Sequence, residues 1–359
     1  MAHNVDLSKP IPPEWRVRVA DSYLHSIGLS LFQPKSQTNR RLLYHPLLVF
    51  IVFMQQICKN LFIIYMNLSN IKLPDEVHEY LGNVDNILGT GLTLNTCLLM
   101  SSLLCISCQI IHYYNYRNGI KPTDLRVFHM ISGFISPKSI GINDMLLVQK
   151  LLKICKYLLM FIKISINFST LIAALFCFIC LSMNSNLFIC IANTILYAIL
   201  VKHVMNIVCY QTVYYFIITY YIESKIKSIN KLLLLNLNRH KVSINISFYR
   251  HLFEDLNAIY VEISEYNANY WAKYLAIIWV TFTVNISCFS YVLIFVSNTN
   301  DIILQFLDMF GVLNFLIALL FVIYISSQLY IEANVKTYNI LNSVTIKNKM
   351  PIFIKLQVS

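Results

Sequence analysis

Residues 157–183, YLLMFIKISINFSTLIAALFCFICLSM, form an apolar run, and after three polar residues a second run begins at Leu187. A run of about 18 or more apolar residues is long enough to cross the hydrocarbon core of a bilayer as a helix. The second run continues as an aromatic-rich helix to Ile222, which is longer than a bilayer requires. This stretch predicts two membrane helices joined by a tight turn, the second of which projects into the cytoplasm.

Four further apolar runs flank this pair. They lie at about 46–66, 87–113, 274–297 and 303–331. Of the 359 residues, 57% are hydrophobic and 13% are charged, which is about half the charged fraction of a typical soluble domain. We therefore expect an all-α fold, a polytopic membrane helical bundle with six visible spans.

The charges of the connecting segments predict the orientation of this bundle. The connections on one side contain 24 Lys and Arg residues, whereas those on the other side contain only Lys72, among acidic residues. Basic residues are retained on the cytoplasmic side of a membrane, where anionic lipids attract them. Both termini are therefore predicted to be cytoplasmic. The net charge of +11 follows from this bias, so we expect the lipid bilayer and no nucleic acid as a partner.

This orientation divides the chain into three parts: a cytoplasmic segment at 1–45, a transmembrane bundle at 46–331 and a cytoplasmic segment at 332–359. The outer connections are too short for a ligand-binding domain, whereas the inner ones are long and helical in character. In 223–273, apolar residues at helical spacing predict amphipathic helices that pack together beneath the bilayer. They are Ile226, Ile229, Leu233, Leu252, Leu256, Ile259 and Val261.

A few side chains within or beside the predicted spans are candidates for ligand binding. Lys59 and Asp308 are ionisable residues inside spans, where such residues are functional candidates; they could pair, or Asp308 could face a water-filled vestibule. The alternative is that Lys59 extends to the interface and Asp308 lies there. Tyr197, Phe289 and Tyr291 could form an aromatic wall for a small organic ligand, or they could be ordinary packing. Asn67, in the sequon Asn67-Leu68-Ser69, is a candidate glycosylation site on the predicted outer side.

No pattern typical of an enzyme, a cofactor or a metal site occurs in the sequence. It lacks a Gly-rich phosphate loop, an HExxH motif and a GxSxG motif, so we expect no enzymatic activity. Two CxxC spacings occur, at Cys105–Cys108 and Cys177–Cys180, but all ten cysteines lie in or beside apolar runs. They are therefore interpreted as small packing residues, and no metal or other cofactor is expected.

The segment after the sixth apolar run is Glu332-Ala333-Asn334-Val335-Lys336-Thr337-Tyr338-Asn339-Ile340-Leu341-Asn342. It resembles the acidic-Ala-x-x-Lys-Thr-x-x-x-Leu stretch of the insect and arthropod gustatory/odorant receptor superfamily, whose overall plan is also similar. The resemblance implies a plasma-membrane subunit of a ligand-gated cation channel that responds to a small-molecule tastant. It also implies a tetramer of identical or related subunits. The family motif would then comprise Glu332, Ala333, Lys336, Thr337 and Leu341, on the cytoplasmic side.

The sequence departs from this family at its seventh helix, which ends with Thr-Tyr, five residues and Gln-Phe. Thr337-Tyr338 is followed at that spacing by Val344-Thr345 and lies in polar surroundings. We therefore expect the sequence to be truncated before the pore helix. A six-span transporter or carrier is the alternative, although it would show repeat symmetry or Gly/Pro-broken helices. A G-protein-coupled receptor is disfavoured, because it places its amino terminus outside the cell.

Overall fold

The computed structural model describes residues 7–17, 41–83, 92–117, 126–142, 144–182, 186–238, 246–268, 272–291, 293–294 and 302–347. Within these ranges the secondary structure is helical and no strand occurs, which confirms the predicted all-α class. The elements in chain order are η1 (Pro13–Trp15), α2 (Arg41–Leu68), α3 (Asp75–Leu81), α5 (Thr93–Arg117), α6 (Arg126–Ile131), η4 (Pro137–Ile140), α7 (Met145–Ser182), α8 (Leu187–Asn238), α9 (Ile246–Tyr266), α10 (Ala272–Tyr291), α11 (Ile302–Tyr330), η7 (Ile331–Lys336) and α12 (Thr337–Lys347).

Five described helices are long and apolar enough to cross a membrane. The qualifying segments are Phe50–Leu68, Thr93–Ile111, Met145–Ser182, Leu187–Leu235 and Phe315–Ser343. A shorter apolar helix, Leu275–Tyr291, occupies the fifth predicted run, so the count of six spans stays a prediction. The 52 residues of α8 correspond to a length of about 78 Å. This confirms that the fourth predicted helix is longer than a bilayer requires.

Helix α7 starts at Met145, well before the apolar run at 157–183 that marked it in the sequence. Its first turns are amphipathic, because the buried residues Val148, Leu151, Leu152 and Cys155 alternate with the exposed residues Lys150, Lys153 and Lys156. Lysines at this spacing interrupt an apolar run without interrupting a helix, since one face of the helix still packs on its neighbours.

Helix α11 does not end in a loop after the sixth predicted run. It continues into η7, a π-helical segment, and then into α12. Tyr330 and Thr337, the residues on either side of η7, both have right-handed helical backbone angles. The last described part of the chain is therefore one helical rod with a widened turn in its middle.

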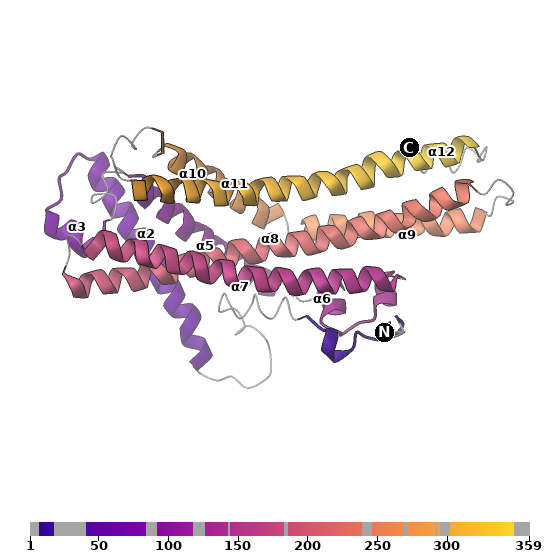
Figure 1. The fold of residues 1–359 in the computed structure, drawn as a ribbon, viewed down its shortest axis with the longest axis horizontal. Coiled ribbons are helices and arrows are strands. Elements are labelled where there is room, and N and C mark those ends of the chain that lie inside the picture. Colours follow the sequence, from indigo (N-terminus) through magenta and orange to yellow (C-terminus); the bar gives the residue numbers. More distant parts are fainter. Residues whose placement is uncertain are drawn as a thin grey trace.

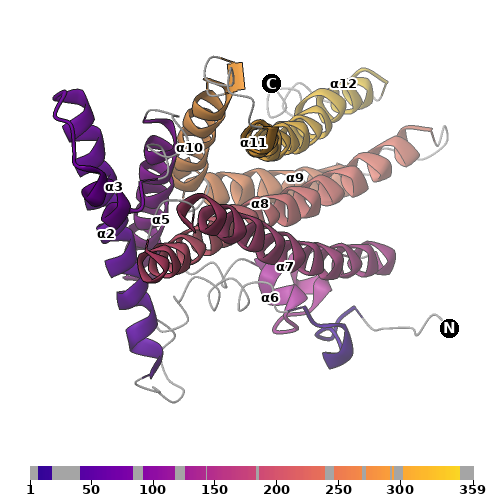
Figure 2. The same ribbon diagram turned by 60° about the vertical axis from the view of Figure 1, so that its left-hand side comes forward.

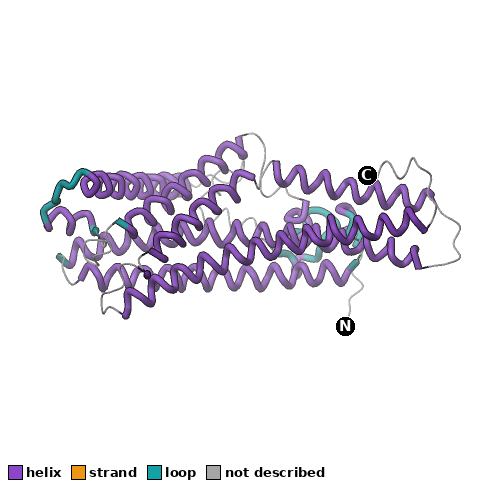
Figure 3. Tube along the Cα trace, turned by 90° about the horizontal axis from the view of Figure 1, so that it is seen from above, coloured by secondary structure: helices purple, strands orange, loops and turns teal. Residues whose placement is uncertain are grey.

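The helices are arranged along one long axis around α8. Figure 1 shows α7, α8, α9 and the α11–α12 rod running along this axis, with α2, α3, α5 and α10 gathered at one end. Figure 2 shows α2, α5 and α10 standing beside that end of α8. The view in Figure 3 shows the helices lying side by side over most of the length. We call the two ends of the molecule the α3 end and the α9 end, after the helices that lie there.

Buried apolar side chains recur along α8 from Leu200 to Leu233 and form the centre of the core. Helices α7, α11, α12, α5 and α9 all pack on α8. Towards the α9 end, α6 and η4 link residues 7–17 to this core. Val17 N donates to Ile131 O at 3.1 Å, and Lys138 N donates to Leu7 O at 3.2 Å.

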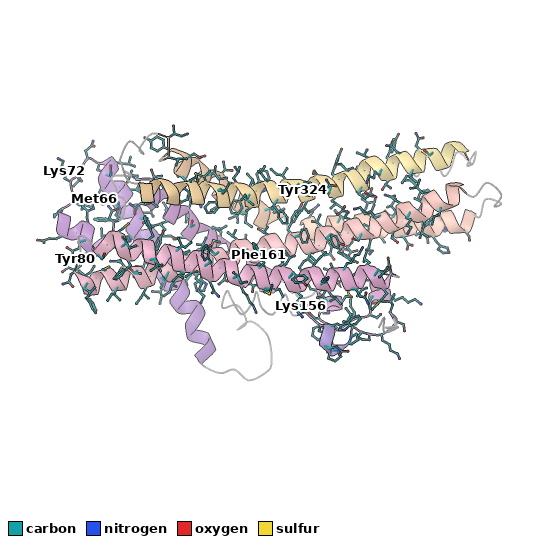
Figure 4. All side chains as sticks on the ribbon, viewed as in Figure 1. Met66, Lys72, Tyr80, Lys156, Phe161 and Tyr324 are labelled. Carbon is teal, nitrogen blue, oxygen red and sulfur yellow. The ribbon has the colours of Figure 1, made fainter. Side chains whose placement is uncertain are left out.

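Large apolar side chains also cover much of the outside of the bundle. Phe161 on α7 and Tyr324 on α11 are 67% and 62% exposed, and Figure 4 shows them at about mid-length of the molecule. Phe168, Leu171 and Leu175 extend this exposed surface along α7. A contiguous apolar exterior of this extent is unusual for a protein in water and fits helices that face lipid.

The predicted amphipathic stripe in 223–273 is confirmed apart from one residue. Six of its members are buried between α8 and its neighbours: Ile226, Ile229, Leu233, Leu252, Leu256 and Ile259. Val261 is 49% exposed, so its assignment to the stripe is wrong. It lies two positions after Ile259, and residues two apart on a helix do not share a face.

Candidate functional site

A small cavity at the α3 end brings two of the predicted ligand-binding residues together. Its volume is about 20 Å³, room for one water-sized molecule. Helices α2, α3, α5, α7 and α8 contribute to its wall. The lining residues are Gln56, Lys59, Gly82, Leu94, Asn95, Leu98, Cys177, Asn193 and Tyr197. Lys59 and Tyr197 therefore share one site, although they lie on different helices.

Gly82 allows α3 to close over this cavity. It terminates α3 in the left-handed region at φ +59°, and its N–H bonds back to Glu79 O and His78 O. A Cβ atom at this position would lie 2.6 Å from Asn193 Cγ on α8. Only glycine fits here without a shift, both because of the backbone conformation and because of the close approach of α8.

Polar contacts tie α3 to the other walls of the cavity. Lys59 Nζ donates to Gly82 O at 3.4 Å. Asn95 Nδ2 donates to Asn83 Oδ1 at 2.9 Å, and the Asn83 amide lies 3.0 Å from His78 Nδ1. Since both asparagines are buried, these bonds hold the end of α3 against α5.

The other predicted ligand-binding residues lie elsewhere. Phe289 on α10 stacks on Phe315 of α11 with ring centroids 6.3 Å apart, and Tyr291 is 55% exposed. Neither belongs to the described wall of the cavity. Asp308 lies on α11, but its side chain is outside the described residues, so its pairing with Lys59 stays a prediction. Asn67 is exposed in the last turn of α2.

A second polar site lies in the α9 half, where the predicted motif residues converge on α8. We call Asn230, Glu332, Lys336 and Thr337 the junction cluster. Asn230 Nδ2 donates to Glu332 Oε1 at 3.2 Å, and Lys336 Nζ donates to Glu332 Oε2 at 2.7 Å. The Thr337 hydroxyl lies 3.1 Å from Asn230 Oδ1 and 2.8 Å from Glu332 O. Asn230, Glu332 and Thr337 are 3%, 5% and 2% exposed.

The π-helical turn explains why this cluster can form. A π segment leaves backbone carbonyls without their usual helical donors, and such turns are often found at functional sites. Here Glu332 O accepts from Thr337, and Ala333 O accepts from the Tyr260 hydroxyl of α9 at 2.8 Å. Ala333 and Leu341 are buried against the core. The predicted motif thus holds the α11–α12 rod to α8 and α9.

Sequence reasoning missed Asn230 and Tyr260. Asn230 lies on the buried stripe of α8 between Ile229 and Leu233, and a polar residue at a core position of an amphipathic helix requires a partner. This position of Asn230 in the sequence could therefore have predicted a buried polar contact. The sequence contains no comparable signal for Tyr260, because its hydroxyl bonds to a backbone carbonyl, which any residue could supply.

A third polar group joins α9 to α8 and η4. Lys225 Nζ lies 3.2 Å from Glu262 Oε2, and the Tyr266 hydroxyl donates to Glu262 Oε1 at 2.7 Å. Lys225 also donates to the Tyr221 hydroxyl at 3.1 Å, which in turn donates to Ile140 O at 3.4 Å. Burial, together with the neighbouring Glu262 carboxylate, raises the pKa of Tyr266.

None of the ten cysteines forms a disulfide bond, and most of them are buried, which agrees with their interpretation as packing residues. The described part of the chain contains no group of three or more His, Cys, Asp or Glu residues that could hold a metal ion. A comparison of the chain with models of protein families, with curated proteins and with solved structures finds no match.

Proposed function

We propose that this chain is a subunit of a chemosensory receptor of the gustatory/odorant type, in which a small molecule gates a cation conductance across the plasma membrane. The observation that carries the proposal is the junction cluster. Glu332, Ala333, Thr337 and Leu341, on which the resemblance rests, are the motif residues that are buried where the last described helix meets α8.

The distribution of charge supports the membrane orientation within this proposal. Helix α3 carries Asp75, Glu76 and Glu79, and Lys72 precedes it. Figure 4 shows Lys72 at the α3 end, together with Met66 and Tyr80. Lysines of the first turns of α7 and of the second half of α8 lie on the other side of the apolar exterior. By the positive-inside rule the α9 end would be cytoplasmic and the α3 end extracellular.

The length of α8 supports a coupling mechanism. Tyr197 in the cavity wall and Asn230 in the junction cluster lie on this one helix, about 50 Å apart along its axis. A tastant is larger than the 20 Å³ cavity, so its entry would displace α3 or α8. Within this proposal, the continuous helix α8 would carry such a displacement to the junction cluster, and the two sites would then be coupled.

Electrical recording tests the conductance. Cells that express the full chain, alone and with related receptor subunits, are exposed to a panel of tastants while G-protein signalling is blocked inside the cell. A ligand-evoked cation current that persists under the block is expected. No evoked current with any subunit combination, despite surface expression, would contradict the proposal and favour a carrier. Asp308→Asn is expected to shift the dose–response curve if Asp308 faces the ligand.

Mapping of the topology tests the orientation separately. Epitope tags at the two termini and a glycosylation acceptor inserted at 70–73 report which side each segment occupies. The proposal expects both tags to be protected from protease in sealed cells and the inserted acceptor to be glycosylated. An accessible amino-terminal tag would instead support the G-protein-coupled class.

A further inference from the structure

Two buried amides on α2, at and beside the cavity of the α3 end, have no hydrogen-bond partner among the described residues. Gln56 is 3% exposed and lines the cavity, and its side chain forms no hydrogen bond within the described residues. Asn60, one turn further along α2, is fully buried, and neither its Oδ1 nor its Nδ2 has a partner within those residues. Buried amides are nearly always hydrogen-bonded, so Gln56 marks a place that a polar occupant would complete.

The charge of the cavity wall determines what that occupant can be. Lys59 is the one charged residue among the described lining residues, and none of those residues is a carboxylate. Its ammonium group makes one long hydrogen bond, of 3.4 Å, to Gly82 O, although it has three protons to donate. A cation is excluded by this charge. A water molecule would satisfy the amide but would leave the half-buried ammonium group of Lys59 without a counter-charge among the described lining residues.

We propose that the cavity binds a single monatomic anion of the size of chloride, held by the Lys59 ammonium group and the Gln56 amide. Asn193 and Tyr197 complete the polar wall; the Asn193 amide donates to Ile189 O at 3.2 Å and has a second N–H proton. With α3 and α8 in the positions seen here, the volume of about 20 Å³ admits one particle of about the size of water, so phosphate, sulfate and carboxylate ligands do not fit. The anion would neutralise Lys59 and link α2 to α8 beneath the cap formed by α3.

This site does not depend on the proposed receptor function. A chain that conducts no current could still bind chloride, and a receptor could have a cavity filled only by water. The two proposals therefore fail in different experiments.

The test uses the full chain purified in detergent. Its unfolding temperature is measured in sodium chloride, sodium bromide and sodium gluconate at equal ionic strength. Chloride and bromide are expected to raise this temperature saturably, by about 2 °C or more, whereas gluconate is too large to enter. Radiolabelled chloride should bind to the same preparation and should be displaced by bromide and not by gluconate.

Three variants identify the site. Lys59→Met and Gln56→Leu are expected to lose the chloride-dependent shift while remaining folded in gluconate, because each exchanges an uncompensated polar group for an apolar one of similar size. Lys72→Met removes a lysine outside the cavity and should retain the shift. Equal unfolding temperatures in chloride and gluconate for the native chain, or no displaceable chloride binding, would overturn the proposal and identify the occupant as water. Retention of the shift in folded Lys59→Met would overturn it as well.

Discussion

The side-chain amide of Asn230 donates to the carboxylate of Glu332 at 3.2 Å across 102 positions of sequence. The other carboxylate oxygen of Glu332 accepts from Lys336 on the same rod. Glu332 is only 5% exposed, and a buried carboxylate is stable when both of its oxygens accept hydrogen bonds. Asn230 of α8 supplies one of these two hydrogen bonds. Asn230 and Glu332 thus link the centre of the core to the last described helix.

Replacement of Asn230 by Leu is expected to destabilise the chain by about 1–3 kcal/mol, because it leaves the buried Glu332 Oε1 without its donor from α8. The Thr337 hydroxyl would lose its contact with Asn230 but keep its bond to Glu332 O. Thermal unfolding of the detergent-solubilised chain measures the loss. Asn334→Leu in the same π segment is the control, since Asn334 is exposed. Equal effects of the two substitutions would show that the junction cluster adds nothing to stability.

The ion pair of Lys225 with Glu262 is expected to matter far more than a similar pair on the surface of the same helix. Glu262→Gln leaves Lys225 without its counter-charge at a largely buried site, where the loss of one partner costs about 3–5 kcal/mol. Glu254→Gln removes a carboxylate that lies 3.2 Å from Arg250 in an exposed pair, which contributes about 0.5 kcal/mol or less. The unfolding free energies of the two variants, measured in parallel, test this difference.

Tyr266 is expected to make the chain sensitive to alkali. Burial and the Glu262 carboxylate raise the pKa of Tyr266 in the folded chain, whereas the unfolded chain titrates near the ordinary value of about 10. Above that pH the unfolded chain loses a proton that the folded chain retains, so this contribution to stability is complete below about pH 10 and declines as pH rises. Tyr266→Phe removes the contribution.

The measurement compares the unfolding free energy of the native chain and of Tyr266→Phe between about pH 8 and about pH 11. At the lower pH the native chain should be more stable, because its hydroxyl donates to Glu262 at 2.7 Å. That advantage should shrink above pH 10 by up to about 1.4 kcal/mol per pH unit. Two parallel curves would refute the raised pKa.

The helices were predictable from the sequence because their signal is local. Apolar runs and the stripe that includes Ile226 and Ile259 depend on periodicity along one segment. The start of α7 at Met145 was missed because the lysines on its exposed face interrupt the apolar run by which the helix was recognised, although the opposite face is buried. The cavity could not be predicted from the sequence. Lys59 and Tyr197 meet there only because five elements pack together, and no local sequence pattern encodes that packing.

Alanine substitutions at Gly82 and Gly141, compared with each other, test the contact between α3 and α8. Both glycines have positive φ values, +59° and +80°, so alanine at either position is expected to cost about 1–2 kcal/mol from the backbone alone. At Gly141 the new Cβ would lie 3.7 Å from Lys225 Cε, which is an ordinary contact. At Gly82 it would lie 2.6 Å from Asn193 Cγ, so one of the two segments must move.

Gly82→Ala is therefore expected to destabilise the chain more than Gly141→Ala, and Asn193→Ala in the same chain should recover the excess. Thermal unfolding of the two single variants, of Asn193→Ala and of the double variant forms a complete cycle. Non-additivity that favours the double variant is the expected result, because removal of the Asn193 amide makes room for the methyl group. Strict additivity would mean that α3 does not lie against α8 at Gly82, and the cavity beneath it would lose its cap.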